Sequence, residues 1–173
     1  MSVESVDSGS MLPTAAIFAG MALTSMVAWL LVLRVAVAPA LRELTRERKL
    51  QLLLLPQQFR HVSALLLVPG VASPDLNAAW VRALVIGDVA TAVLAILAVF
   101  ALSRRARLGV PLAGIASVIG LLDLLKNVAT APGVGAADHM QAAAAIPTLL
   151  VPLMLLMHVW ALHVLLTSRP AAA

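Results

Sequence analysis

The stretch from Leu50 to Gly70, LQLLLLPQQFRHVSALLLVPG, constrains the fold most, because it is apolar at both ends and polar in the middle. As an α-helix it would be about 31 Å long, which matches the roughly 30 Å hydrocarbon core of a bilayer. An ionisable group at the centre of a membrane span is costly, and such a group usually marks a functional site. We therefore expect the function to depend on what meets Arg60 and His61.

The composition supports a membrane protein. Of the 173 residues, 62% are hydrophobic and 12% are charged, and the mean hydropathy is +1.02. Ordinary soluble domains contain about 25% charged residues. The net charge of +4 comes from basic residues at the ends of apolar runs, which the positive-inside rule explains better than nucleic-acid binding does. The absence of cysteine excludes disulfides, thiolate catalysis and Cys-ligated metals.

The pattern of apolar runs predicts an all-α, polytopic bundle of transmembrane helices. A polar N-terminal tail, 1–13, precedes a single transmembrane domain, 14–170. In the first run, small residues recur every fourth position and predict close packing of a neighbouring helix; they are Ala16, Gly20, Thr24 and Ala28. The five expected spans are 14–38, 50–70, 78–102, 108–130 and 141–167.

The distribution of basic residues indicates that 50–70 crosses the membrane. The basic segments 42–49 and 104–107 should both face the cytoplasm. An even number of crossings must then separate them, and 78–102 supplies only one. The same rule places the N-terminus outside and the C-terminus, with Arg169, in the cytoplasm. The alternative is four spans and a surface or re-entrant helix.

Five spans would bring several ionisable residues to the same depth. Each lies within about four residues, or 6 Å, of the middle of its span, and charges at that depth should face the interior and pair with one another. We expect Arg60 to pair with Asp88, Asp123 or both. The candidate catalytic residues are Arg60, His61, Asp88, Asp123 and His158.

Further polar or polarisable side chains near this layer are candidates for ligand binding: Gln57, Gln58, Thr91, Asn127 and Met154. A buried ion pair can also serve only to fix helix register. The number of polar groups argues against a purely structural role, because small-residue packing already supplies helix association.

Four segments carry a resemblance: FRHVSALLLVPG with Arg60, IGD ending at Asp88, LLDLLKN ending at Asn127 and IPTLLVPLMLLMH ending at His158. With these the chain resembles a broad set of small bacterial multi-pass membrane proteins that have no assigned activity. The resemblance covers most of the chain after residue 50, implies no reaction, and suggests the bacterial inner membrane as its location.

Four functions fit the polar layer. The first is binding of a lipophilic small molecule with acid–base chemistry of the isomerase, hydratase or cyclase type, in which a histidine moves a proton, an aspartate is the base and Arg60 stabilises negative charge. The second is a proton or ion relay in a transporter or transporter subunit. The third is haem held by His61 and His158. The fourth is a structural or partner-binding subunit.

The expected partners follow from the same features. They are membrane lipid and a lipophilic ligand, with no nucleic acid, no bound metal and no required cofactor, and self-association into a homo-oligomer is left open.

Overall fold

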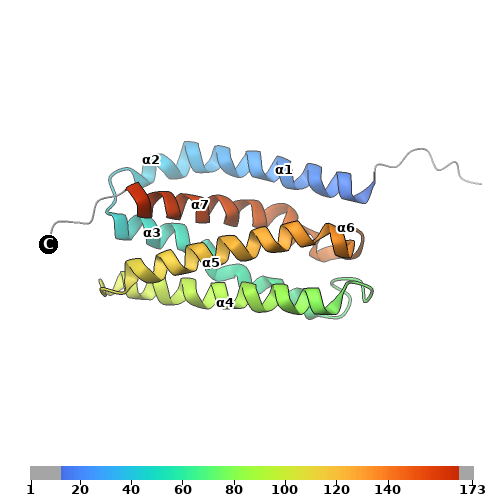
Figure 1. The fold of residues 1–173 in the computed structure, drawn as a ribbon. Coiled ribbons are helices and arrows are strands. Elements are labelled where there is room, and N and C mark those ends of the chain that lie inside the picture. The colour runs from blue at the N-terminus through green and yellow to red at the C-terminus, as the bar shows by residue number, and fades with distance from the viewer. Residues whose placement is uncertain (1–12, 168–173) are drawn as a thin grey trace, which may run out of the picture.

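The computed structural model describes residues 13–167 and is helical almost throughout, without a β-strand in that range. Figure 1 shows long helices lying side by side in one bundle. The N-terminal tail before residue 13, and residues 168–170 at the end of the expected domain with Arg169, lie outside the described residues. The helices have these bounds: α1 Thr14–Val32, η1 Leu33–Val37, α2 Ala38–Leu41, α3 Arg46–Leu54, η2 Pro56–Leu67, α4 Ala78–Ser103, α5 Gly109–Thr130, η3 Pro132–Val134, α6 Ala136–His139, η4 Gln141–Ala144, η5 Ile146–Leu150 and α7 Val151–Thr167.

Four helical stretches are long and apolar enough to cross a membrane, namely 14–41, 78–103, 109–130 and 141–167. This indicates a membrane protein and confirms the all-helical prediction. The bounds agree with those expected from the sequence to within a few residues, because charged clusters and Gly/Pro turns punctuate the apolar runs.

The predicted fifth segment is helical but consists of two different helices. α3 is an α-helix, and η2, which begins at Pro56, is a 3₁₀-helix. Proline lacks the backbone N–H that the α-helical pattern requires, and the tighter helix begins there. A 3₁₀-helix has three residues per turn, so side chains three apart share a face. The buried residues follow this period: Gln57, Arg60, Ser63 and Leu66.

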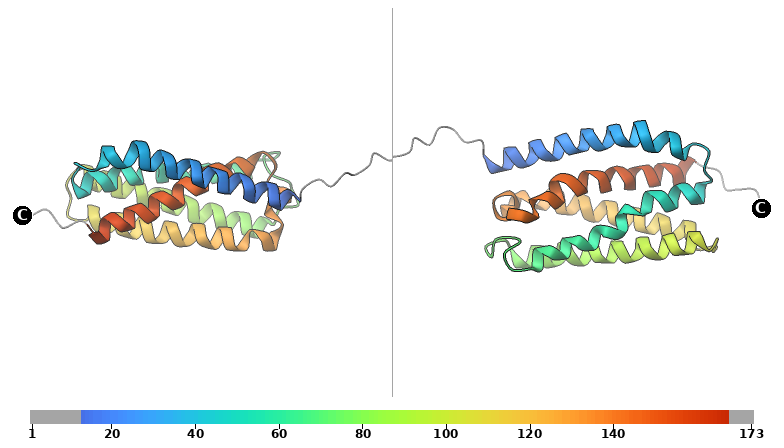
Figure 2. Two further views of the ribbon diagram at one scale, coloured as in Figure 1. Left: turned by 90° about the horizontal axis from the view of Figure 1, so that it is seen from above. Right: turned by 180° about the vertical axis from the view of Figure 1, so that it is seen from behind.

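α3 and η2 together run the length of the bundle beside α4 (Figure 2). At one end, Arg46 Nη2 donates to the carbonyl of Leu165 near the end of α7, at 2.8 Å. At the other end, the loop after η2 meets the turns before α7, where the N–H of Ser73 donates to the His139 carbonyl at 2.8 Å.

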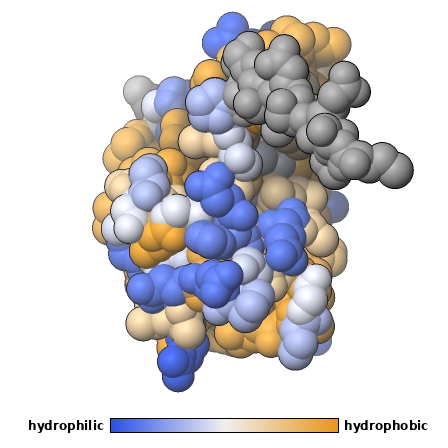
Figure 3. All heavy atoms as spheres, turned by 90° about the vertical axis from the view of Figure 1, so that its right-hand side faces the viewer, coloured by the Kyte–Doolittle hydropathy of each residue, from blue (hydrophilic) through white to orange (hydrophobic). Residues whose placement is uncertain are grey.

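Buried apolar side chains form two clusters, one towards each end of the bundle. One cluster includes Leu50 and Leu102 and lies at the end where α7 terminates. The other includes Leu66 and Met140 and lies at the end that carries α6. Figure 3 looks onto this second end, where hydrophilic side chains gather in the middle of the face with apolar ones around them.

α1 lies at the periphery and packs on α7, η5 and α6. It contains no buried residue, and no neighbouring atom approaches within 4 Å of a Cβ built on Gly20. The face from Ala16 to Ala28 is therefore not covered by another helix within the described residues, and the prediction that a neighbouring helix packs on it stays a prediction. Periodicity identifies a face but not whether another helix of the same chain reaches it.

The period of η2 predicts different effects for two adjacent leucines. Leu66 lies in an apolar cluster, whereas the side chain of Leu65 is exposed. Leu66→Ala should cost about 2–5 kcal/mol of unfolding free energy, as buried leucines do, and Leu65→Ala much less. Thermal unfolding of both variants in the same detergent checks this. A larger loss for Leu65→Ala would indicate that 56–67 is α-helical, since an α-helix continuing from α3 turns Leu65 inward.

Candidate functional site

Arg60 is the centre of the polar layer, and all five of its N–H groups have a partner. Nε and Nη2 donate to Asp88 Oδ1 at 2.8 and 2.5 Å, and Nη2 also donates to Asp123 Oδ2 at 2.7 Å. Nη1 donates to the Gly120 carbonyl at 2.9 Å and lies 3.4 Å from His158 Nε2. The prediction that Arg60 pairs with Asp88, Asp123 or both is confirmed, because Arg60 forms an ion pair with each of them.

The tautomer of His158 follows from this contact. An arginine can only donate, so Nε2 must accept and Nδ1 carries the proton. The imidazole is fully buried, and its Nδ1 has no partner among the described residues. Gln57 lies nearby, because its Nε2 donates to the carbonyl of Met154, one turn before His158. The site therefore holds a neutral histidine beside the guanidinium.

Two glycines make the close approach of the helices possible. A Cβ on Gly87 would overlap the carboxylate of Asp123, and a Cβ on Gly120 would overlap the ring of His158 and the methyl group of Thr91. Helices α4 and α5 can thus approach the charged groups only because these positions lack a side chain.

Asp88 uses only one of its two oxygens in the ion pair. Both bonds from Arg60 reach Oδ1, and no hydrogen bond or ion pair in residues 13–167 involves Oδ2. The buried hydroxyl of Ser63 faces Asp88 without making a hydrogen bond. About 10% of the Asp88 side chain is exposed. Asp88 is therefore anchored on one side and available on the other.

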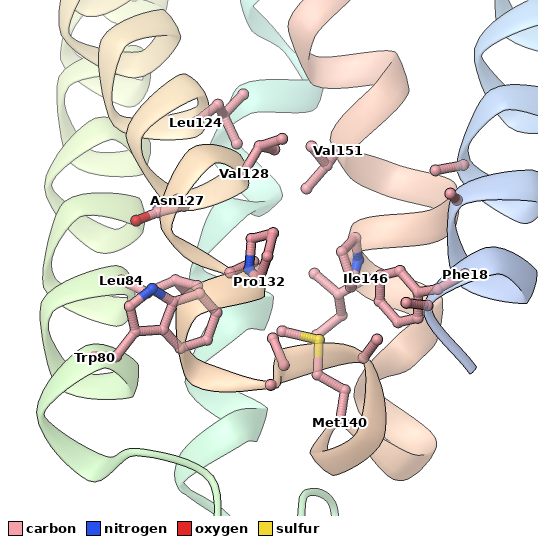
Figure 4. A pocket seen from close by; sticks show the side chains of 18 of the residues that line it. Phe18, Trp80, Leu84, Leu124, Asn127, Val128, Pro132, Met140, Ile146 and Val151 are labelled. Carbon is pink, nitrogen blue, oxygen red and sulfur yellow. The ribbon is translucent and has the colours of Figure 1, made fainter. Parts of the chain in front are cut away.

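Asp88 also lines a cavity of about 590 Å³ between α1 and the rest of the bundle. Figure 4 shows its mainly apolar walls, with Asn127 on α5 and Trp80 and Leu84 on α4 to one side and Phe18 on α1 to the other. Small-molecule sites in proteins span about 300–1,000 Å³ and combine apolar walls with a few polar groups. This cavity has that character.

Asn127 supplies the second polar group of the wall. Its Nδ2 donates to Asp123 Oδ2 at 3.2 Å, which fixes the orientation of the amide because a carboxylate accepts only. Its Oδ1 has no partner among the described residues. Asp88 and Asn127, the two polar residues of this part of the wall, each have one oxygen without a hydrogen-bond partner among the described residues.

Other candidate residues lie away from the cavity. Thr91 is buried and donates to the Gly87 carbonyl, Met154 contributes its carbonyl to Gln57, and Gln58 is half-buried outside the cavity wall. His61 is exposed, and its Nδ1 lies 2.8 Å from the Gln58 carbonyl. The prediction that His61 faces the interior is wrong, because adjacent side chains on a 3₁₀-helix point about 120° apart. His61 and His158 do not converge, so the geometry gives the haem alternative no support.

Sequence reasoning missed Gly120, Ser63 and the cavity itself. Gly120 lies on the buried face of α5 with Ala113, Ala116 and Ser117, and this spacing of small residues was the available signal. The period of three from Gln57 to Leu66 would have revealed Ser63. No sequence pattern marks the cavity, which is formed by residues from several helices.

The structure predicts the cost of removing Arg60. Arg60→Leu would leave two buried carboxylates facing each other, and breaking such a pair costs about 3–5 kcal/mol. Adding Asp88→Asn or Asp123→Asn should recover part of the loss, measured by thermal unfolding in a fixed detergent. Strict additivity in both double variants would contradict a shared cluster.

Arg82→Leu is the matched control, because Arg82 is also an arginine of the bundle but is exposed and contacts only the Ala78 carbonyl. Its loss should change stability by no more than about 0.5 kcal/mol.

The chain matches one family of known proteins. A family model described as a domain of unknown function, DUF8737, matches residues 17–166, which includes every residue of the Arg60 cluster and most of the cavity. No curated protein and no solved structure gave a significant match. The resemblance to a family without an assigned activity is thereby confirmed, and the chain belongs to the DUF8737 family.

Proposed function

We infer that α3 and η2 together form a fifth membrane crossing, with the N-terminus outside and the C-terminus in the cytoplasm of a bacterial inner membrane. Their combined length of about 35–40 Å exceeds the hydrocarbon core. The basic segments 42–49 and 104–107 adjoin the apolar cluster at one end, where Leu41, Leu50 and Leu102 pack together. This arrangement supports a common cytoplasmic side.

Cysteine labelling tests this topology, because the chain contains no cysteine of its own. Glu43 and Asp75 are exposed in the loops on either side of α3 and η2. In intact cells, Asp75→Cys should react with a membrane-impermeant maleimide, and Glu43→Cys should react only after permeabilisation. Reaction of both from the same side would rule out the fifth crossing.

We propose that the protein binds a lipophilic small molecule in the 590 Å³ cavity and carries out acid–base chemistry on it. One observation carries the proposal: Asp88 lines an apolar cavity and is held by Arg60 through only one of its two oxygens. A base must be held in place while keeping a lone pair directed at the substrate. Asp88 meets both requirements.

The surrounding groups have matching roles. Arg60 would stabilise negative charge that develops near Asp88, because its guanidinium is enclosed and its position is fixed by five contacts. Asp123 would hold Arg60 and the amide of Asn127 in place. The unpartnered Nδ1–H of His158 is a hydrogen-bond donor within the same cluster. Reactions that move a proton on carbon, such as isomerisation, hydration or cyclisation, fit this set.

Incorporation of deuterium tests the chemistry before the substrate is known. The protein, purified with its endogenous lipophile, is incubated in D₂O, returned to H₂O to remove exchangeable label, and the extract is analysed by mass spectrometry. Deuterium bound to carbon should accumulate with the unaltered protein and fall at least 100-fold with Asp88→Asn, since general bases contribute about 10²–10⁴-fold. Ligand retention shows whether the variant still binds.

His61→Gln is the control, because His61 is an ionisable residue of the same helix that faces away from the site. Equal incorporation by Asp88→Asn and the unaltered protein would refute a role as base. A chain that co-purifies with no lipophile, and takes up none when supplied with a lipid extract, would refute the binding proposal.

A further inference from the structure

The ionisable residues that line the cavity within the described part of the chain are all acidic. Its ionisable lining residues are Asp88 and Asp138, and within the described part of the chain no Lys, Arg or His lines it. Behind the wall, the single charge of Arg60 faces two carboxylates, Asp88 and Asp123. With both carboxylates ionised, the three groups together carry one surplus negative charge.

Lys126 compensates this surplus only weakly. Its Nζ lies 3.4 Å from Asp123 Oδ1, and about half of its side chain is exposed. Ion pairs with an exposed partner are weak, whereas a surplus charge inside a membrane protein demands a close partner. A positively charged ligand in the cavity would supply that partner beside Asp88.

The rest of the wall suits a cation with an apolar body. The rings of Phe18 and Trp80 line the cavity, and aromatic faces attract organic cations. Asp88 and Asn127 are the polar lining residues next to the Arg60 cluster, and the Oδ1 of Asn127 has no partner among the described residues.

We propose that the ligand is a lipophilic amine, bound in its protonated form, with its ammonium group at the part of the cavity wall formed by Asp88 and Asn127. This inference rests on the proposed function and names the class of its substrate. A volume of 590 Å³ corresponds to about 20 water-sized volumes of about 30 Å³ each, which sets the approximate number of non-hydrogen atoms.

A matched series of probes tests the inference: dodecylamine, dodecanol and dodecanoate, which share one chain and differ in the charge of the head group. Calorimetric titration uses the full chain in nanodiscs of zwitterionic lipid, with empty nanodiscs subtracted. Dodecylamine should bind at least tenfold more tightly than dodecanol, and dodecanoate should show no saturable binding.

Variants of the protein test separately whether binding depends on the negative charge of the Arg60 cluster and whether the ligand lies in this cavity. Asp123→Asn removes the surplus charge, so dodecylamine affinity should fall about tenfold more than dodecanol affinity does. Asp75→Asn, which removes an acid from the exposed loop outside this cavity, should change neither. Ala22→Trp places an indole in the cavity and should weaken both ligands. Melting temperatures in the same nanodiscs identify variants that fail to fold.

The outcomes distinguish the two proposals. Dodecanol or dodecanoate binding as tightly as dodecylamine, with Ala22→Trp abolishing it, would overturn the amine inference and leave lipophile binding intact. Amine binding that is insensitive to both Asp123→Asn and Asp88→Asn would also overturn the inference. If none of the three probes binds in excess of empty nanodiscs, both proposals fail.

Discussion

The burial of one guanidinium is the constraint on which the rest of this structure depends. Arg60 is 2% exposed within a bundle of helices of membrane-spanning length, where an unpaired charge would cost several kcal/mol. Its five donors reach α4, α5 and α7 from η2. The arginine therefore fixes the depth and rotation of four helical segments at once, between two apolar clusters.

The ion pair between Arg60 and Asp88 leaves one carboxylate oxygen of Asp88 without a bond from Arg60. If Arg60 donated to both oxygens of Asp88, each carboxylate oxygen would have a partner, and the ion pair would serve only to fix the register of the helices. Instead both bonds from Arg60 reach Oδ1, and Asp88 is also one of the residues that line the cavity. The cavity exists because α1 packs on α7, η5 and α6 and is not buried among the remaining helices. Asp88 thus both pairs with Arg60 and lines the cavity.

The backbone of η2 decides which polar groups enter the site. From Gln57 onward, a period of three turns Arg60 and Ser63 inward and His61 outward. Long 3₁₀ segments are uncommon, so an α-helical period was the reasonable expectation for residues after Pro56. That expectation placed His61 in the interior layer and overlooked Ser63. Arg60, Asp88, Asp123 and His158 meet in the structure as predicted, and the error for His61 lay in its rotation about the helix axis.

The sequence by itself determined the helical class, the bounds of the apolar helices and the pairing of Arg60 with aspartates. These follow from local hydrophobicity and from the cost of burying a charge alone, which depend on composition and depth. Only the tertiary structure decided that both aspartates share Arg60, that the Gly120 carbonyl completes its shell, and that Asp88 and Asn127 border a cavity. Those features depend on which helices become neighbours and how each is rotated, and distant segments must meet before either is defined.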